Sequence, residues 1–136
     1  MNIETLPLFE GIDADVVRQI SQASSAKTFN TGDTIFEKGS SAQFLYILEQ
    51  GEIELVDKSR DSNPIKLAQP GEVFGWSSLA ESGVYTSTAV CRSEASVQCI
   101  GKSDIEPVLN QHPKAAVTLY QRLGELLSKR MPKVVE

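Results

Sequence analysis

Hydrophobic and polar positions alternate in short runs through the middle of the chain, whereas both ends carry helical spacing. The segment 52–58 illustrates the first pattern. It places Ile53 and Leu55 on one face and Glu52 and Glu54 on the other, as in a half-buried strand, with Val56 as the exception. The same reasoning predicts seven strands, at 26–30, 34–37, 44–49, 52–58, 65–69, 86–92 and 96–100.

A glycine followed by an acidic residue and a β-like run occurs three times, beginning at Gly32, Gly51 and Gly71. The intervals of about 20 residues hold two short strands and two turns, but not the helix that a parallel βαβ unit needs. The polar segment 59–64 is rich in turn-forming residues and suits a hairpin tip. We therefore expect a mainly β fold, either a sandwich or a barrel.

Helices are expected on both sides of this β region. Asp13 can cap a helix whose apolar stripe runs from Val16 to Ala23. Residues 103–106 read as a capping box for a short helix that ends near Asn110. Pro113 can open a final helix of about 18 residues.

The final helix carries two parallel apolar stripes, which together are wider than packing on one surface requires. The first consists of Ala116, Leu119, Leu123 and Leu126. The second consists of Val117, Tyr120, Gly124, Leu127 and Met131. We expect the first stripe to cover the β region and the second to pair with a second copy of the chain, with Gly124 allowing close approach. The alternative is that one broad core absorbs both stripes.

Composition favours a single globular domain, residues 1–136, with 40% hydrophobic and 23% charged residues. The net charge of −5 argues against binding to nucleic acid or acidic membranes, and the cations Lys129, Arg130 and Lys133 suit the end of a helix. The first residues lack the pattern of a secretory signal, and no apolar run is long enough to span a bilayer. We expect a cytoplasmic protein.

Cysteine and histidine usage gives no metal site or cofactor. Cys91 and Cys99 lack metal-ligand spacing and read as small buried hydrophobic residues. If residues 93–94 turn between the last two strands, the two cysteines do not face each other, and a disulfide is not expected. His112 is the one histidine, so the clustered imidazoles of a cupin-type enzyme cannot form. We expect no catalytic activity.

The segment 74–88 is the candidate site, because it is dense in hydroxyl groups and holds two large aromatic residues. Gly75 allows a tight turn, and residues 77–80 could form one helical turn whose amides point at an acceptor. Read on its own, a stretch between strands that is rich in serine and threonine is usually a solvated loop.

Four motifs in order resemble the cyclic nucleotide-binding domain family: LPLF at 6–9, FNTGDTIFEKG at 29–39, LYILEQGEIEL at 45–55 and PGEVFG at 70–75. The resemblance covers nearly the whole chain. It implies an eight-stranded jelly-roll β-barrel at about 26–100, an N-terminal helix, and C-terminal helices at about 103–131. In the bacterial regulators of this family, the final long helix forms the dimer.

The resemblance also implies that the loop after Phe74 and Gly75 is a phosphate-binding cassette. In the family, a glutamate directly after this pair contacts the ribose and an arginine nine residues later pairs with the phosphate, whereas this chain has Trp76 and Tyr85 there. Losing two charged hydrogen bonds costs roughly 3–6 kcal/mol, or about 10²–10⁴-fold in affinity. Trp76 and Tyr85 could fill the pocket, bind a neutral or aromatic ligand, or stack on a base. The candidate ligand-binding residues are Phe74, Gly75, Trp76, Ser77, Ser78, Leu79, Ala80, Tyr85, Thr86 and Ser87.

The sequence thus predicts a non-catalytic regulatory domain, homodimeric through its last helix, that binds cyclic nucleotides weakly or takes another small-molecule effector. The alternative is a ligand-free interaction module that docks a partner protein through that helix. In bacterial relatives a DNA-binding helix-turn-helix follows the long helix, and this chain stops at Glu136, about where it would begin. We expect no direct nucleic-acid binding by this chain.

Overall fold

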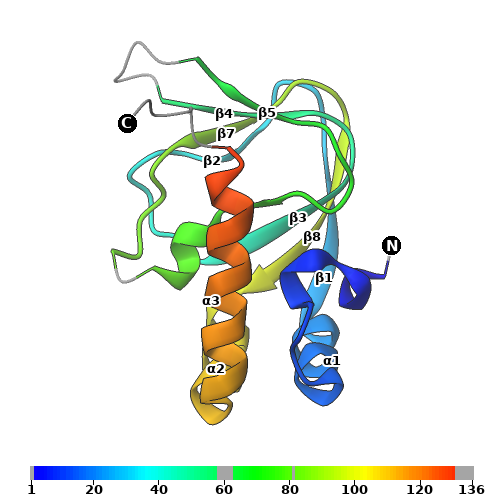
Figure 1. Cartoon of the computed structure of the whole chain (residues 1–136). Coiled ribbons are helices and arrows are strands. Elements are labelled where there is room, and N and C mark those ends of the chain that lie inside the picture. Colours follow the sequence, from blue (N-terminus) through cyan, green and yellow to red (C-terminus); the bar gives the residue numbers. More distant parts are fainter. Residues whose placement is uncertain (1, 58–62, 81, 131–136) are drawn as a thin grey trace.

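The computed structural model describes residues 2–57, 63–80 and 82–130, which form two antiparallel sheets with helices at both ends of the chain (Figure 1). One sheet has the strand order β1-β8-β3-β6 and the other has the order β2-β7-β4-β5. The strands are β1 (Ser24–Phe29), β2 (Thr34–Phe36), β3 (Phe44–Gln50), β4 (Ile53–Val56), β5 (Ile65–Leu67), β6 (Val73–Phe74), β7 (Thr88–Cys91) and β8 (Ala95–Gly101).

The predictions of a mainly β fold and of eight strands are confirmed, but the strands do not close into the expected jelly-roll barrel. Within the described ranges the eight strands divide into two separate four-stranded sheets, and none pairs with a strand of the opposite sheet. Strand β6 was not predicted. The strand expected at 86–92 is shorter and spans Thr88–Cys91.

The hairpin expected around residues 93–94 is also wrong. Strand β7 pairs with β2 and β4, whereas β8 pairs with β1 and β3, so the chain changes sheets between them. Cys91 and Cys99 consequently lie in different sheets, and both are buried free thiols. The geometric reason from which no disulfide was expected, a shared hairpin, therefore does not apply. Burial raises the pKa of both thiols, which disfavours the reactive thiolate.

Three α-helices flank the sheets: α1 (Ala14–Gln22), α2 (Lys102–Gln111) and α3 (Pro113–Ser128). The 3-10 turns η1 (Ile3–Thr5) and η2 (Pro7–Phe9) precede α1. Asp13 caps α1 as predicted, since its carboxylate accepts from the Asp15 amide at 2.9 Å. The capping box predicted at 103–106 is wrong, because α2 begins at Lys102 and Gly101 caps it without a side-chain hydrogen bond.

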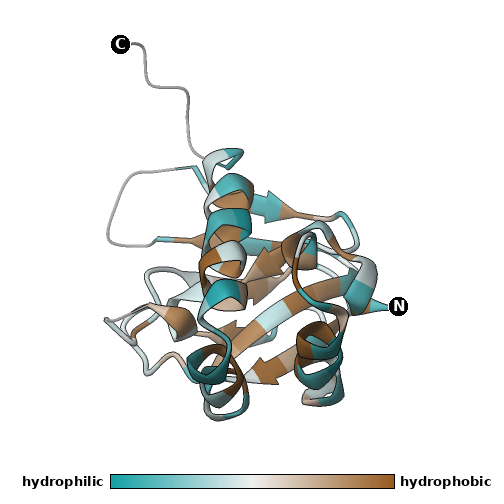
Figure 2. Ribbon diagram, turned by 60° about the horizontal axis from the view of Figure 1, so that its bottom comes forward, coloured by the Kyte–Doolittle hydropathy of each residue, from teal (hydrophilic) through white to brown (hydrophobic). Residues whose placement is uncertain are grey.

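The core has two parts, separated by the sheet that contains β3. Leu45 and Ile47 of β3 belong to the cluster under the helices, whereas Tyr46 and Leu48 belong to the cluster between the sheets. Both faces of β3 are thus buried, as alternation along a central strand allows. Figure 2 shows this hydrophobic centre, with hydrophilic residues on the outer turns of the helices. No helix in the described part of the chain is long and apolar enough to cross a membrane.

Substitution of Gly51 tests a turn in which the backbone packs closely against the segment at residues 94–95. Its φ is +105°, and a Cβ there would lie 2.5 Å from the carbonyl oxygen of Glu94. Gly51→Ala should lower the free energy of unfolding by about 2–5 kcal/mol, the cost of a left-handed backbone plus a steric clash.

Gly32→Ala is the matched control, because Gly32 has a φ of +89° but nothing within 4 Å of the added Cβ. It should lose about 1–2 kcal/mol, from the backbone alone. Urea denaturation of both variants measures the difference. Equal losses would contradict the close contact at Gly51.

Candidate ligand-binding loop

The loop after β6 reverses direction at Gly75 and enters a single turn of 3-10 helix, η3 (Trp76–Leu79). Gly75 has a φ of +73°, and a Cβ there would lie 3.0 Å from both the Phe44 carbonyl and the Tyr46 ring. Glycine is required because the backbone is left-handed and packs directly on β3. The helical turn predicted at residues 77–80 is present and begins one residue earlier, at Trp76.

Tyr85 lies at the other end of the loop with its side chain buried between the sheets, 4% exposed. Its ring stacks on Phe36, with the centroids 3.8 Å apart and the planes 12° apart. Its hydroxyl donates to the Phe44 carbonyl at 2.8 Å and accepts from the Phe44 amide at 3.2 Å. The phenol is therefore satisfied as donor and as acceptor by the first residue of β3.

Tyr85 is part of a cluster of four aromatic rings, with Phe36, Tyr46 and Phe74. The Tyr46 and Phe74 rings are 5.2 Å apart, and the Phe36 and Tyr46 rings are 5.9 Å apart. Burial raises the pKa of Tyr46 and of Tyr85, which holds both phenols neutral. The interior beside the loop is thus lined by uncharged rings, which offer a phosphate no opposite charge.

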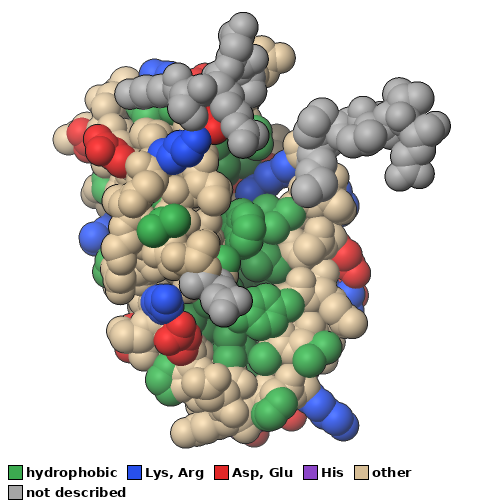
Figure 3. Space-filling view, turned by 90° about the vertical axis from the view of Figure 1, so that its left-hand side faces the viewer, with side chains coloured by type: hydrophobic (Ala, Val, Ile, Leu, Met, Phe, Trp, Pro, Cys, Tyr) green, Lys and Arg blue, Asp and Glu red, His purple; other side chains and the backbone are tan. Residues whose placement is uncertain are grey.

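Trp76 lies on the other side of the loop, half-buried against α3. With Leu79 and Ala80 it lines a groove of about 250 Å³, whose far wall is Tyr120, Leu123, Gly124 and Leu127. Figure 3 shows hydrophobic side chains gathered along one face of the molecule. Trp76 packs against the cluster under the helices, whereas Tyr85 belongs to the cluster between the sheets, so the two side chains do not line one cavity. Tyr85 fills space between the sheets, and Trp76 packs on the final helix.

The remaining predicted site residues differ in exposure. Phe74, Gly75, Ser77 and Ser78 are buried, Leu79, Ala80 and Ser87 are half-buried, and Thr86 is exposed. The hydroxyl of Ser78 is fully buried and has no hydrogen-bond partner among the described residues. Sequence reasoning missed Phe36 and Tyr46. The alternation along β3 could have identified Tyr46 as facing the space between the sheets.

The two stripes of α3 have different environments. Leu119 and Leu123 are buried, and Ala116 and Leu126 pack beside them, so the first stripe covers the core as predicted. In the second stripe, Val117 is 58% exposed and Tyr120 is 46% exposed. A Cβ built on Gly124 meets nothing within 4 Å. Leu127 is half-buried, and Met131 lies outside the described residues.

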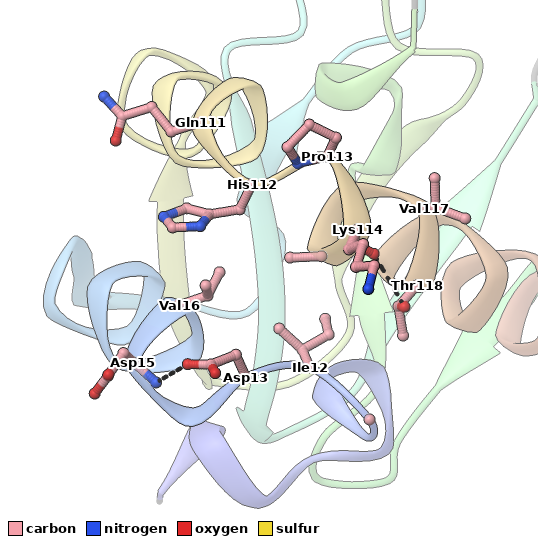
Figure 4. A pocket seen from close by; sticks show the side chains of 12 residues that line it. Ile12, Asp13, Asp15, Val16, Gln111, His112, Pro113, Lys114, Val117 and Thr118 are labelled. Carbon is pink, nitrogen blue, oxygen red and sulfur yellow. Dashed lines mark hydrogen bonds between the residues drawn. The ribbon is translucent and has the colours of Figure 1, made fainter.

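A further cleft, of about 1120 Å³, lies away from this loop, between the start of α1 and the junction of α2 with α3. Figure 4 shows Ile12, Asp13 and Val16 along one wall and His112 and Pro113 along the other. Asp13 is engaged in capping α1. The described residues contain no cluster of three or more groups able to hold a metal ion.

Comparison with known proteins adds independent observations. The sequence profile of the cyclic nucleotide-binding domain matches residues 26–112. Cyclic nucleotide-gated channel beta-3 of Canis lupus familiaris is 23% identical over 133 residues, which are 96% of this chain and 17% of the channel. The chain spans about a fifth of the length of the first curated relatives that it matches.

Two solved structures are similar to it. A putative cyclic nucleotide-binding protein from Geobacter metallireducens aligns over 94% of both chains, with a TM-score of 0.84 and 25% identity. The catabolite activator protein of Thermus thermophilus aligns over 91% of this chain and 57% of its own, with a TM-score of 0.70 and 25% identity.

Tyr85→Phe tests the buried phenol. At pH 7 it should lower the free energy of unfolding by about 1–3 kcal/mol, because the Phe44 amide and carbonyl lose their partner. Burial raises the pKa of Tyr85 in the folded protein. Above pH about 10, the ordinary tyrosine pKa, the unfolded chain releases a proton that the folded chain retains, so stability falls with rising pH.

As the pH rises above about 10, the free energy of unfolding should therefore fall less in the variant than in the wild type. Urea denaturation at several pH values measures both effects. Tyr46 contributes in the same direction, because burial and the neighbouring Tyr85 raise its pKa in the folded protein, and Tyr85→Phe removes the part that is due to Tyr85. Equal stability at pH 7 would contradict the two bonds to Phe44.

Proposed function

Because the chain belongs to the cyclic nucleotide-binding domain family, we propose that it is a non-catalytic regulatory domain whose own Tyr85 takes the place of a bound phosphate. In this proposal the domain binds cyclic AMP and cyclic GMP weakly or not at all. The supporting observation is the position of Tyr85, buried, stacked on Phe36 and bonded twice to Phe44.

Two energetic terms disfavour a cyclic nucleotide at this loop. The charged contacts that glutamate and arginine would supply at positions 76 and 85 are absent, which costs roughly 3–6 kcal/mol. Displacing Tyr85 would break two hydrogen bonds and one ring stack, at a cost of about 0.5–1.5 kcal/mol each. Both terms weaken binding, so a site that is micromolar in a family member becomes millimolar or weaker here.

A second candidate is a ligand-free interaction module, which docks a partner protein through α3. The exposed second stripe favours it, because Val117 and Tyr120 present apolar surface to solvent beside an open Gly124. We propose that a second copy of the chain covers this stripe and that the domain acts as a homodimer. We also propose, as a variant of the first candidate, that the regulatory domain binds another small molecule in place of a cyclic nucleotide.

Calorimetric titration with cyclic AMP and cyclic GMP tests the nucleotide chemistry. The wild type should show no binding at micromolar concentrations. A Trp76→Glu, Tyr85→Arg double variant restores both charges and should bind about 10²–10⁴-fold more tightly.

A Trp76→Gln, Tyr85→Gln double variant is the uncharged control, because it opens the same space without supplying charge. Circular dichroism should confirm that both variants are folded. Micromolar binding by the wild type would contradict the proposal. So would a charged variant that binds no better than the uncharged control.

Sedimentation equilibrium tests the dimer. The wild type should sediment as twice 14.9 kDa, the mass of one chain. Val117→Asp should weaken association about tenfold or more, because a carboxylate would lose its water in the interface.

Gln121→Asp is the matched control, since residue 121 is exposed and lies outside both stripes. It should leave the mass unchanged. A monomeric wild type would exclude the homodimer and favour docking of a different protein on the same stripe.

A further inference from the structure

Helix α3 and Arg130, the second residue after its end, contact the candidate loop through hydrogen bonds at two separated points. The Tyr120 hydroxyl donates to the carbonyl of Leu79, the last residue of η3, at 3.3 Å. The Arg130 guanidinium donates to the carbonyl of Val73, the first residue of β6. The two bonds therefore bracket the segment from Val73 to Leu79, which contains Gly75 and η3.

The Arg130 side chain is enclosed by neighbouring residues. The side chain is half-buried and lines a cavity of about 300 Å³ with Leu6, Pro7 and Leu126. Glu72 lines the same cavity, and its charge opposes the effect of burial, which lowers the pKa of Arg130. A partly desolvated cation must be hydrogen-bonded to be tolerated, and the Val73 carbonyl meets that need.

Glu72 is itself fixed in place. Its carboxylate accepts hydrogen bonds from the amides of Ala68 and Gln69, both at 3.0 Å. The acidic side chain that faces Arg130 is thus held by the turn before β6 and does not swing freely. The contact joins the residues that follow α3 to the start of β6.

Between the two bonds lies the apolar groove, in which Trp76 and Leu79 face Leu123 and Leu127 of α3. Apolar contact of this kind is non-directional and does not set how far α3 lies along the loop. The hydrogen bonds from Tyr120 and Arg130 are directional and constrain it. Trp76 is also the chain's one tryptophan, so its fluorescence reports directly on this groove.

We propose that Arg130 is a latch that, together with Tyr120, holds α3 on the segment Val73–Leu79 and keeps the loop in the arrangement described above. Arg130 is a positioning residue. It contacts neither Tyr85 nor the aromatic cluster in any bond described above, and it acts through the backbone of β6. Release of the latch would expose Trp76 and the apolar wall of α3. The proposal does not depend on whether the loop binds a nucleotide.

Arg130→Met in the full chain tests the latch, because methionine keeps an apolar stem and removes every hydrogen-bond donor. Amide hydrogen exchange at residues 75–80 should become roughly 10- to 100-fold faster, which corresponds to loss of a hydrogen bond from a charged donor. Acrylamide quenching of Trp76 should rise in parallel. Tyr120→Phe should accelerate exchange at Leu79 and Ala80 by about 2- to 10-fold, since its donor is neutral.

Lys129→Met is the matched control, an exposed cation one residue away that should alter neither readout. Arg130→Lys should recover part of the protection, since it restores a cationic donor. Unchanged exchange and quenching in Arg130→Met would overturn the latch. Increased quenching together with a halved mass in sedimentation would also overturn it, because protection of Trp76 would then come from a second copy of the chain.

Discussion

The structure around the candidate loop depends on how the Tyr85 phenol is buried. A hydroxyl placed between two sheets must find a donor and an acceptor, and the backbone of Phe44 supplies both. Phe44 begins β3, a central strand whose two faces are both buried. The end of the loop is therefore fixed to a rigid part of the fold. The stack on Phe36 also links it to β2 in the opposite sheet.

Gly75 divides the loop into an inner and an outer part. The left-handed turn directs the chain from Phe74, which lies between the sheets, to Trp76, which packs on α3. The two aromatic residues that replace the family's charged pair thus serve two different layers of the protein. Tyr85 adds to the core between the sheets, and Trp76 adds to the contact between loop and helix.

The sequence was informative about features that depend on neighbours along the chain. Alternation located most strands, Asp13 was identified as the cap of α1, and the spacing of apolar residues separated the buried stripe of α3 from the exposed one. It failed where the answer depends on distant partners. Alternation at 86–92 and 96–100 gives the face of each residue but not the sheet to which the strand belongs, so the crossing at residues 93–94 was taken for a hairpin. The separation of Trp76 from Tyr85 has the same origin, because it follows from contacts with α3 and β3, which are remote in sequence.

A ligand shifts a protein between two arrangements only by binding one of them more tightly. In our proposal, Tyr85 is covalently part of the chain and is present in every molecule. Its concentration at the site therefore does not change with conditions in the cell, as that of a diffusing ligand would. A regulatory signal would then have to act on a contact that can adopt two arrangements. We infer that the contact between α3 and the loop is such a contact. One side of that helix is buried, the other is exposed, and hydrogen bonds from Tyr120 and Arg130 join this end of the chain to the loop. Whatever covers Val117 and Tyr120 would act on the same helix that holds Trp76, so the direction of control would run from the helix to the loop.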